Sequence, residues 1–215
     1  GAANLQDAYP LAPLQEGLLF HHLLQPEVDP YVLATAWSFD SRAALDAFLA
    51  ALQQVIDRHD VLRSAVLWQG LPEPVHLVWP RARPPVEQPA LPAADDVAAQ
   101  LAAHADPRRQ RMDLGQAPLL RAYVQGDARS GAWHLQLLLH HLMLDHTTLA
   151  QLVDEIALIR AGRSAELPAP VPFRDYVARV RASERRPQHE AFFRALLGDL
   201  DEPTAPFGRV DVRGE

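Results

Sequence analysis

The densest group of reactive side chains in the sequence is the segment HHLMLDH, residues 140–146. It holds three imidazoles and one carboxylate, from His140, His141, His146 and Asp145. Imidazole titrates near neutral pH, so one ring can take a proton from an attacking amine or hydroxyl and return it later. A neighbouring carboxylate can hold the tautomer of a ring or lock the loop by pairing with an arginine. These residue types fit the proton transfers of acyl transfer.

Two other interpretations of this segment stay open on the residues alone. Loops rich in histidine bind zinc, which would make the segment a metal site. A buried histidine usually needs only one hydrogen-bond partner, so a purely structural cluster is the second alternative. The spacing His141-x-x-x-Asp145 often occurs by chance and does not choose among the three.

A strand and a helix must position these side chains. Residues Trp133–Leu139 alternate and then run apolar, as a central strand does when both of its faces are covered. This strand delivers His140 and His141 at its end, where a loop is exposed while the sheet fixes its place. Thr148, with Gln151 three residues later, has the spacing of a capping box and is expected to open the next helix.

The rest of the sequence predicts an α/β lobe in which strands alternate with helices. The clearest helical period lies at residues 45–56, where apolar residues recur every three or four positions. Asp40 or Ser41 can cap this helix, which is expected to end near Arg58 and His59. The other expected elements are a helix from Pro13 to Leu24, strands at Tyr31–Phe39, Val61–Trp68 and Pro74–Trp79, an extended loop at 80–92, a helix from Asp95 to His104, a strand entered through 112–124, and helical segments separated by a break at Pro187 before Glu190.

Composition excludes several classes of function. The chain has 215 residues, 48% hydrophobic and 22% charged, which fits one soluble globular lobe. It has no cysteine, which removes disulfides and thiolate nucleophiles, and a cytoplasmic location is expected. The net charge of −7 argues against nucleic acid, and the apolar runs are too short for a membrane span. All 20 basic residues are arginine, so the lysine of Schiff-base and P-loop chemistry is missing.

Five segments, in order, resemble the motifs of one family. HHLMLDH resembles the HHxxxDG signature of the condensation domains of nonribosomal peptide synthetases, within the chloramphenicol-acetyltransferase-like superfamily. The resemblance covers about residues 7–200, but only the first half of the family's domain. The other four matches are YPLAPLQEGLLFHHLL (9–24) with the family's opening helix, RHDVLRSAV (58–66) with its RHxxLR segment, MDLGQAPLLRAYV (112–124) with its FDLxxxPLLR strand entry, and PFRDYVARV (172–180) with its YxDYA segment.

The resemblance implies a chloramphenicol-acetyltransferase-like α/β lobe with a mixed central sheet flanked by helices. Residues 1–215 are then a single domain, the amino-terminal lobe of a condensation domain whose carboxy-terminal lobe is absent. Independently of the resemblance, residues 1–3 are expected to be a cloning scar. The implied reaction joins a donor acyl or peptidyl thioester to an acceptor aminoacyl amine. Both substrates arrive on the phosphopantetheine of peptidyl carrier proteins. The implied partners are these carriers, the missing lobe and adjacent synthetase domains, with no bound cofactor and no metal.

The resemblance also gives roles to residues of the motifs. His141 matches the histidine beside the condensing amine and thioester, where it acts as a base or as a positioner, and His140 matches a mainly structural first histidine. Asp145 matches a structural carboxylate that is expected to pair with Arg63, the last residue of RHDVLR. Because removing one member of a buried pair leaves an uncompensated charge, Arg63→Ala is expected to damage folding more than chemistry.

Two departures from the family pattern indicate a subtype. His146 stands where the signature has glycine. His21 and His22, followed by Asp29, resemble the HH-L-L-x-x-x-G-D motif of dual condensation/epimerisation domains, although Val28 replaces its glycine. The two histidines are alternatively ordinary, partly exposed helix residues. The rival functions are an epimerisation domain, which forms no amide, and a non-catalytic lobe that only docks carrier proteins.

Overall fold

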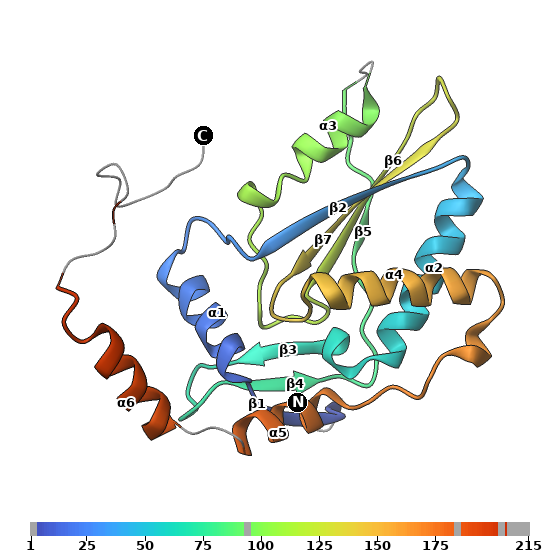
Figure 1. Ribbon diagram of the computed structural model, residues 1–215. Helices are drawn as coiled ribbons and strands as arrows, with labels where there is room; N and C mark the ends of the chain where they lie inside the picture. The colour runs from blue at the N-terminus through green and yellow to red at the C-terminus, as the bar shows by residue number, and fades with distance from the viewer. Residues whose placement is uncertain (1–3, 93–95, 183–185, 202–204, 206–215) are drawn as a thin grey trace. The chain divides into compact units, whose positions relative to one another are not determined.

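The computed structural model describes residues 4–92, 96–182, 186–201 and 205 (Figure 1). The chain divides into two compact units, residues 1–178 and residues 179–215. The first unit contains both sheets and the histidine-rich segment. Residues 1–3, interpreted above as a cloning scar, lie outside the described residues.

A four-stranded sheet forms the centre of the first unit. Its order is β2-β7-β6-β5, with bounds β2 (Val32–Phe39), β7 (Trp133–His140), β6 (Leu120–Gly126) and β5 (Val86–Glu87). β7 pairs antiparallel with β2 and β6, while β5 runs parallel to β6, so the sheet is mixed, as predicted. β7 is buried from Leu135 to His140, which confirms it as a central strand. Its last residue, His140, lies opposite Val32 at the start of β2.

A second, three-stranded antiparallel sheet has the order β1-β4-β3. Its strands are β1 (Asp7–Pro10), β4 (Val75–Val78) and β3 (Ser64–Leu67). The sequence predicted the β3–β4 hairpin, whose turn contains Gly70 at φ +74°, a conformation that glycine adopts without a steric penalty. The strand expected from Val61 begins instead with the short 3₁₀ helix η2 (Asp60–Arg63), which turns Arg63 into the interior.

Helices pack against the sheets as the apolar periods predict. The helices of the first unit are α1 (Pro13–Leu24), α2 (Arg42–Arg58), α3 (Val97–His104), α4 (His146–Arg160) and the start of α5 (Phe173–Ala182), with 3₁₀ turns η3 (Pro107–Arg109) and η4 (Ser164–Glu166). α2 buries Leu45, Phe48, Leu52, Val55 and Ile56 against β2, β7 and α4 (Figure 1). Burial of one such side chain stabilises the fold by about 2 kcal/mol. In the described part of the chain, no helix has the length and apolar character needed to cross a membrane.

Three helix starts test the expected caps. Ser41 caps α2, as predicted, and its Oγ accepts from the Ala44 N–H at 3.2 Å. The predicted Thr148 cap is wrong, because α4 begins at His146 and its N-cap is Asp145. Two separate helices form around Pro187, as predicted, but the second, α6 (Arg186–Leu197) in the second unit, begins at Arg186 and not at Glu190, so the proline lies in its first turn, where a missing N–H costs nothing.

Candidate active site

His141 follows directly after β7, and two hydrogen bonds hold it. Its backbone N–H donates to the Tyr31 carbonyl at 2.9 Å, which ties the loop to the segment that enters β2. Its ring Nδ1 lies 2.9 Å from the Leu144 carbonyl oxygen. A carbonyl can only accept, so Nδ1 carries a proton, and in the neutral ring Nε2 then carries the lone pair that a proton acceptor needs. Within the described residues, Nε2 has no hydrogen-bond partner.

His141 lines a cavity of about 530 Å³ in the first unit. The volume falls in the range usual for small-molecule sites. The lining of the cavity is mostly apolar, as is usual for such sites, with a few polar groups among the apolar side chains. The apolar and aromatic lining comes from α1, the loop after β7 and the start of α5, namely Ala12, Leu14, Leu18, Leu142, Met143, Leu144, Phe173 and Tyr176, and the polar lining is Gln15, Tyr31, His141, Asp145 and Thr148.

His140 lies behind this cavity wall and is fully buried. Its Nε2 contacts Asp29 Oδ2 at 3.1 Å, and its Nδ1 accepts from the Leu142 N–H at 3.1 Å. Both ring nitrogens are therefore occupied by the protein, and neither is available to a substrate.

Asp29, in the loop between α1 and β2, is the main residue that the sequence analysis did not place in the site. Burial alone would raise its pKa, but hydrogen bonds from His140 and His22 outweigh burial, so the pKa lies well below its usual range. Its other oxygen accepts from the Tyr31 N–H at 3.2 Å. Asp29 is consequently a buried carboxylate that accepts hydrogen bonds from three donors.

Gln15 of α1 is a second buried polar residue that the sequence analysis did not single out. Its Nε2 donates to the Leu142 carbonyl at 2.7 Å, directly beside His141. Its Oε1 lies 3.1 Å from Nε2 of His76, whose Nδ1 lies 3.1 Å from Ser64 Oγ. Burial lowers the pKa of His76 to about 4, so this ring is neutral at neutral pH, and it lies between Ser64 and Gln15. The Ser64 hydroxyl itself donates to the Val61 carbonyl at 2.7 Å.

Asp145 does not form the expected ion pair with Arg63, and this prediction is wrong. The Asp145 side chain is exposed, and its Oδ1 accepts from the Thr148 N–H at 2.8 Å as the cap of α4. Hydrogen bonds from the backbone and hydroxyl of Thr148 hold the pKa of Asp145 below its usual range. An aspartate immediately before an apolar helical period is the N-cap signature that indicates this role from sequence.

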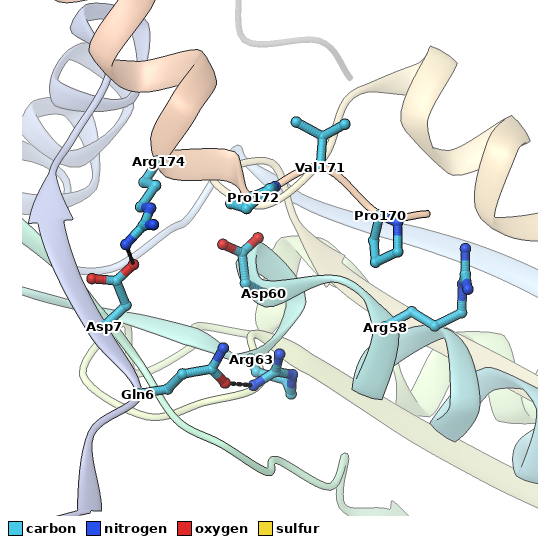
Figure 2. A pocket seen from close by; sticks show the side chains of 9 residues that line it. All are labelled: Gln6, Asp7, Arg58, Asp60, Arg63, Pro170, Val171, Pro172 and Arg174. Atoms are coloured by element: carbon cyan, nitrogen blue, oxygen red, sulfur yellow. Dashed lines mark hydrogen bonds and ion pairs between the residues drawn. The ribbon is translucent and has the colours of Figure 1, made fainter. Parts of the chain in front are cut away.

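Arg63 is buried and satisfied by other groups. Its guanidinium donates to Gln6 Oε1 at 2.7 Å, to the Ile56 carbonyl at 3.2 Å and to the Trp79 carbonyl. Figure 2 shows it beside a separate polar cavity of about 280 Å³. Arg63 therefore joins η2 to the segments around it and takes no part in the loop that carries His141.

The remaining predicted site residues separate into different environments. His146 is the exposed first residue of α4 and is not among those that line the His141 cavity. His21 is exposed, and its Nδ1 lies 2.5 Å from the hydroxyl of Tyr31, which does line that cavity. His22 is buried, and its Nδ1 contacts Asp29 Oδ2 at 2.7 Å. Of the two histidines, only His21 is in contact with the cavity wall.

The chain has the chloramphenicol-acetyltransferase-like fold of solved condensation domains. The first condensation domain of the calcium-dependent antibiotic synthetase aligns with a TM-score of 0.73 at 19% identity, covering 94% of this chain and 51% of that one. The starter condensation domain of rhizomide synthetase RzmA aligns with a TM-score of 0.68 at 23% identity, covering 93% and 50%. At these identities the alignments establish the fold.

Sequence similarity establishes the family. The family model of the condensation domain matches residues 5–206. Malpinin synthetase of Mortierella alpina is 46% identical over 216 residues, and one component of the linear gramicidin synthase of Brevibacillus parabrevis is 31% identical over 218. The matches cover 100% and 94% of this chain but only 3% and 4% of those proteins. The chain belongs to the condensation-domain family of nonribosomal peptide synthetases.

Proposed function

We propose that this chain is the amino-terminal lobe of a condensation domain that forms amide bonds in nonribosomal peptide synthesis. One observation carries the proposal. His141 directly follows a buried central strand, lines a largely apolar cavity and, in its neutral form, has a free lone pair on Nε2 because Nδ1–H is bonded to the Leu144 carbonyl.

In the proposed reaction, the amine of an acceptor aminoacyl group attacks the carbonyl carbon of a donor acyl or peptidyl thioester. Nε2 of His141 accepts the proton that the amine nitrogen loses as the new C–N bond forms. The tetrahedral intermediate then breaks its C–S bond, and the thiol leaves with that proton. Holding two tethered substrates together supplies most of the rate increase, and a positioned base contributes roughly 10²–10⁴-fold.

The proposed partners follow from this chemistry. Donor and acceptor peptidyl carrier proteins deliver the substrates on phosphopantetheine arms, and adjacent synthetase domains load those carriers. A carboxy-terminal lobe supplies the opposite wall of the reaction chamber, so the chain alone is expected to have little activity. The reaction needs no resident cofactor or metal.

Donor epimerisation by the same domain is a second candidate, and one contact favours it. His21 is hydrogen-bonded to the hydroxyl of Tyr31, and Tyr31 lines the same cavity as His141, so a second proton-transfer group contacts a residue of the cavity lining. His22 has no such access because it is buried against Asp29. Any epimerisation role of the pair is therefore assigned to His21.

The experiment uses the complete condensation domain with an L-loaded donor carrier and a loaded acceptor carrier, and follows product mass and chirality. His141→Ala is compared with His134→Ala, which removes an imidazole from the opposite end of the same strand, β7. Amide product that is lost only in His141→Ala supports condensation, and a D residue at the donor position adds epimerisation. Inversion without an amide would support an epimerisation domain, and no reaction from folded wild type with loaded carriers would support a docking lobe.

A further inference from the structure

A buried triad of His22, Asp29 and His140 lies directly behind the loop that carries His141. The relative exposures of the three residues are 4%, 1% and 0%. One oxygen, Asp29 Oδ2, lies 2.7 Å from His22 Nδ1 and 3.1 Å from His140 Nε2. The residues come from α1, from the loop after it and from the end of β7, so the triad joins three segments of the first unit.

The hydrogen bonds of His140 decide what kind of site this is. The three side chains bring ligand atoms within 4.8 Å of one another, which a metal ion could use. However, His140 Nδ1 accepts from the Leu142 N–H, so Nδ1 carries no proton and the proton of the neutral ring is on Nε2. A metal on Nε2 would turn the ring into an imidazolate, whereas metal-bound histidines donate their other N–H. The geometry is that of a carboxylate held by two imidazole donors.

Asp29 reaches the backbone around His141 by two routes. In the first, Asp29 orients the His140 ring, whose Nδ1 accepts from the Leu142 N–H, directly after His141. In the second, Asp29 Oδ1 accepts from the Tyr31 N–H at 3.2 Å, and the Tyr31 carbonyl accepts from the His141 N–H at 2.9 Å. The backbone of His141 is thus fixed at its own nitrogen and at the next one.

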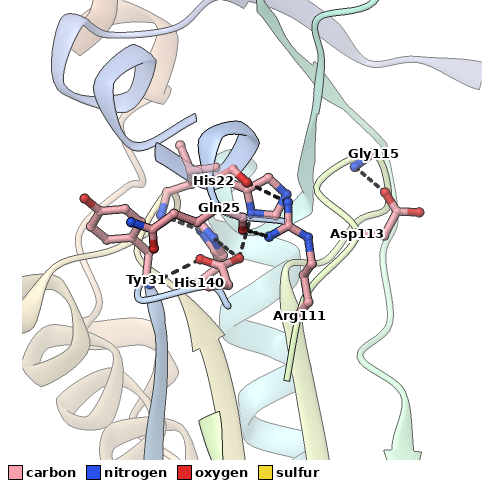
Figure 3. Close-up of polar contacts among 9 residues, drawn as sticks. His22, Gln25, Tyr31, Arg111, Asp113, Gly115 and His140 are labelled. Carbon is pink, nitrogen blue, oxygen red and sulfur yellow. Dashed lines mark hydrogen bonds and ion pairs between the residues drawn. The ribbon is translucent and has the colours of Figure 1, made fainter. Parts of the chain in front are cut away.

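Arg111 holds the far side of the triad. Figure 3 shows its guanidinium bonded to backbone oxygens at the end of α1. The bonds are 2.6 Å to the His22 carbonyl and 2.7 Å to the Gln25 carbonyl, two of the carbonyls that a helix end leaves without an intrahelical partner. These two bonds fix the end of α1, and they therefore also fix the side from which the His22 ring contacts Asp29.

We infer that Asp29 is a positioning residue, which holds His140 in its Nε2–H tautomer and sets the place of the His141 ring in the cavity. Its catalytic consequence rests on the proposed function. The residues of the amino-terminal histidine motif then have two different roles. His22 and Asp29 organise the loop that carries His141, whereas His21 contacts the Tyr31 hydroxyl. Asparagine cannot replace Asp29, because an amide offers one oxygen and its nitrogen would face an N–H donor on the other side.

The first test reads the tautomer directly. Nitrogen-15 NMR of the histidine rings in the full chain at neutral pH should show His140 protonated at Nε2 and unprotonated at Nδ1, and added Zn²⁺ should not change these signals. A proton on Nδ1, or displacement of the Nε2 proton by zinc, overturns the inference. This measurement needs only the wild type, so it remains decisive if the Asp29 variant does not fold.

The second test compares Asp29→Asn with Asp154→Asn, which makes the same chemical change on α4, away from the triad. In the complete domain, Asp29→Asn should lower kcat for amide formation roughly ten- to hundredfold, the loss that follows from a misplacement of about 1 Å, with little change in KM for the loaded carriers. The His140 signals should shift to a mixture of tautomers, and Asp154→Asn should match the wild type in both. A folded Asp29→Asn domain with wild-type kcat and tautomer overturns the inference. A wild type that forms no amide overturns the proposed function and leaves the tautomer result standing.

Discussion

His76 makes the stability of the chain depend on pH in a range above the titration of the carboxylates. Burial lowers the pKa of its ring from the usual 6.5 to about 4 in the folded chain. Between these two values the unfolded chain binds a proton that the folded chain does not, so stability rises with pH across the interval. The contribution is fully present above about pH 6.5 and is lost as the pH falls towards 4. At 1.36 kcal/mol for each unit, the loss is about 3 kcal/mol.

Urea unfolding at several pH values between 7 and 4, followed by the fluorescence of the four tryptophans, measures this loss. The variant His76→Gln removes the titrating group, so the stability difference between wild type and variant should shrink by about 3 kcal/mol over the range. A constant offset from the substitution itself cancels in this comparison. The control is His134→Gln, at the partly exposed end of β7, which should keep the pH dependence of the wild type.

The same titration should reach the active-site loop. Protonation would place a charge on this buried ring beside Gln15, and Gln15 holds the Leu142 carbonyl. Hydrogen exchange at the amides of the loop should accordingly speed up at acid pH in the wild type before global unfolding. Parallel pH curves for wild type and His76→Gln would refute the reasoning, because they would mean that the folded ring titrates as it does in the unfolded chain.

Three further outcomes follow from the contacts described. Asp145→Ala should lower the free energy of unfolding by about 1 kcal/mol, the usual cost of a lost N-cap, and Arg63→Ala by about 3 kcal/mol, because it removes packing and the donors to the buried Ile56 carbonyl and the partly buried Trp79 carbonyl. In a double-mutant cycle these losses should add, and a coupling well above about 0.5 kcal/mol would reinstate the ion pair. His141→Gln should keep the urea midpoint but reduce amide formation at least about 100-fold, and a much smaller loss would leave His141 as a positioner. His22→Leu should cost about 2 kcal/mol in urea unfolding, since a buried carboxylate loses a donor, whereas the exposed His21→Leu should cost little, and equal costs would contradict the assignment.

Elements whose stability comes from apolar burial could be predicted from the sequence. The apolar period of α2 coincides with its buried face, and the apolar run of β7 correctly indicated a strand covered on both sides. The position of His141 at the end of that strand followed from the same pattern. The Arg63–Asp145 pair failed because residue types do not reveal burial: η2 turns Arg63 inward to backbone carbonyls, while a local capping bond occupies Asp145 at the surface.

The polar contacts that hold the site could not be predicted in the same way. Asp29 lies 111 residues from His140 in the sequence, and Gln15 lies 127 from Leu142, so no local spacing links them. Asp29 entered the sequence analysis only as part of a subtype motif, and Gln15 only as a letter of the opening helix. A polar residue in a loop or helix is usually solvated, and only the tertiary fold makes these two exceptions.

The residues that α1 buries explain why its sequence has only a weak apolar pattern. Gln15, Leu19 and His22, at positions i, i+4 and i+7, point inward, so two of its three buried residues are polar. Burying an amide and an imidazole costs free energy unless both are hydrogen-bonded, and here both bond towards the loop after β7. Gln15 holds the Leu142 carbonyl directly, and His22 reaches His140 through Asp29. Apolar contact alone would let a helix slide or rotate by part of a turn, whereas these directional bonds give one rotation and one register. The weak apolar pattern of α1 is therefore what a helix needs when its task is to fix the loop of His141 rather than to fill a core.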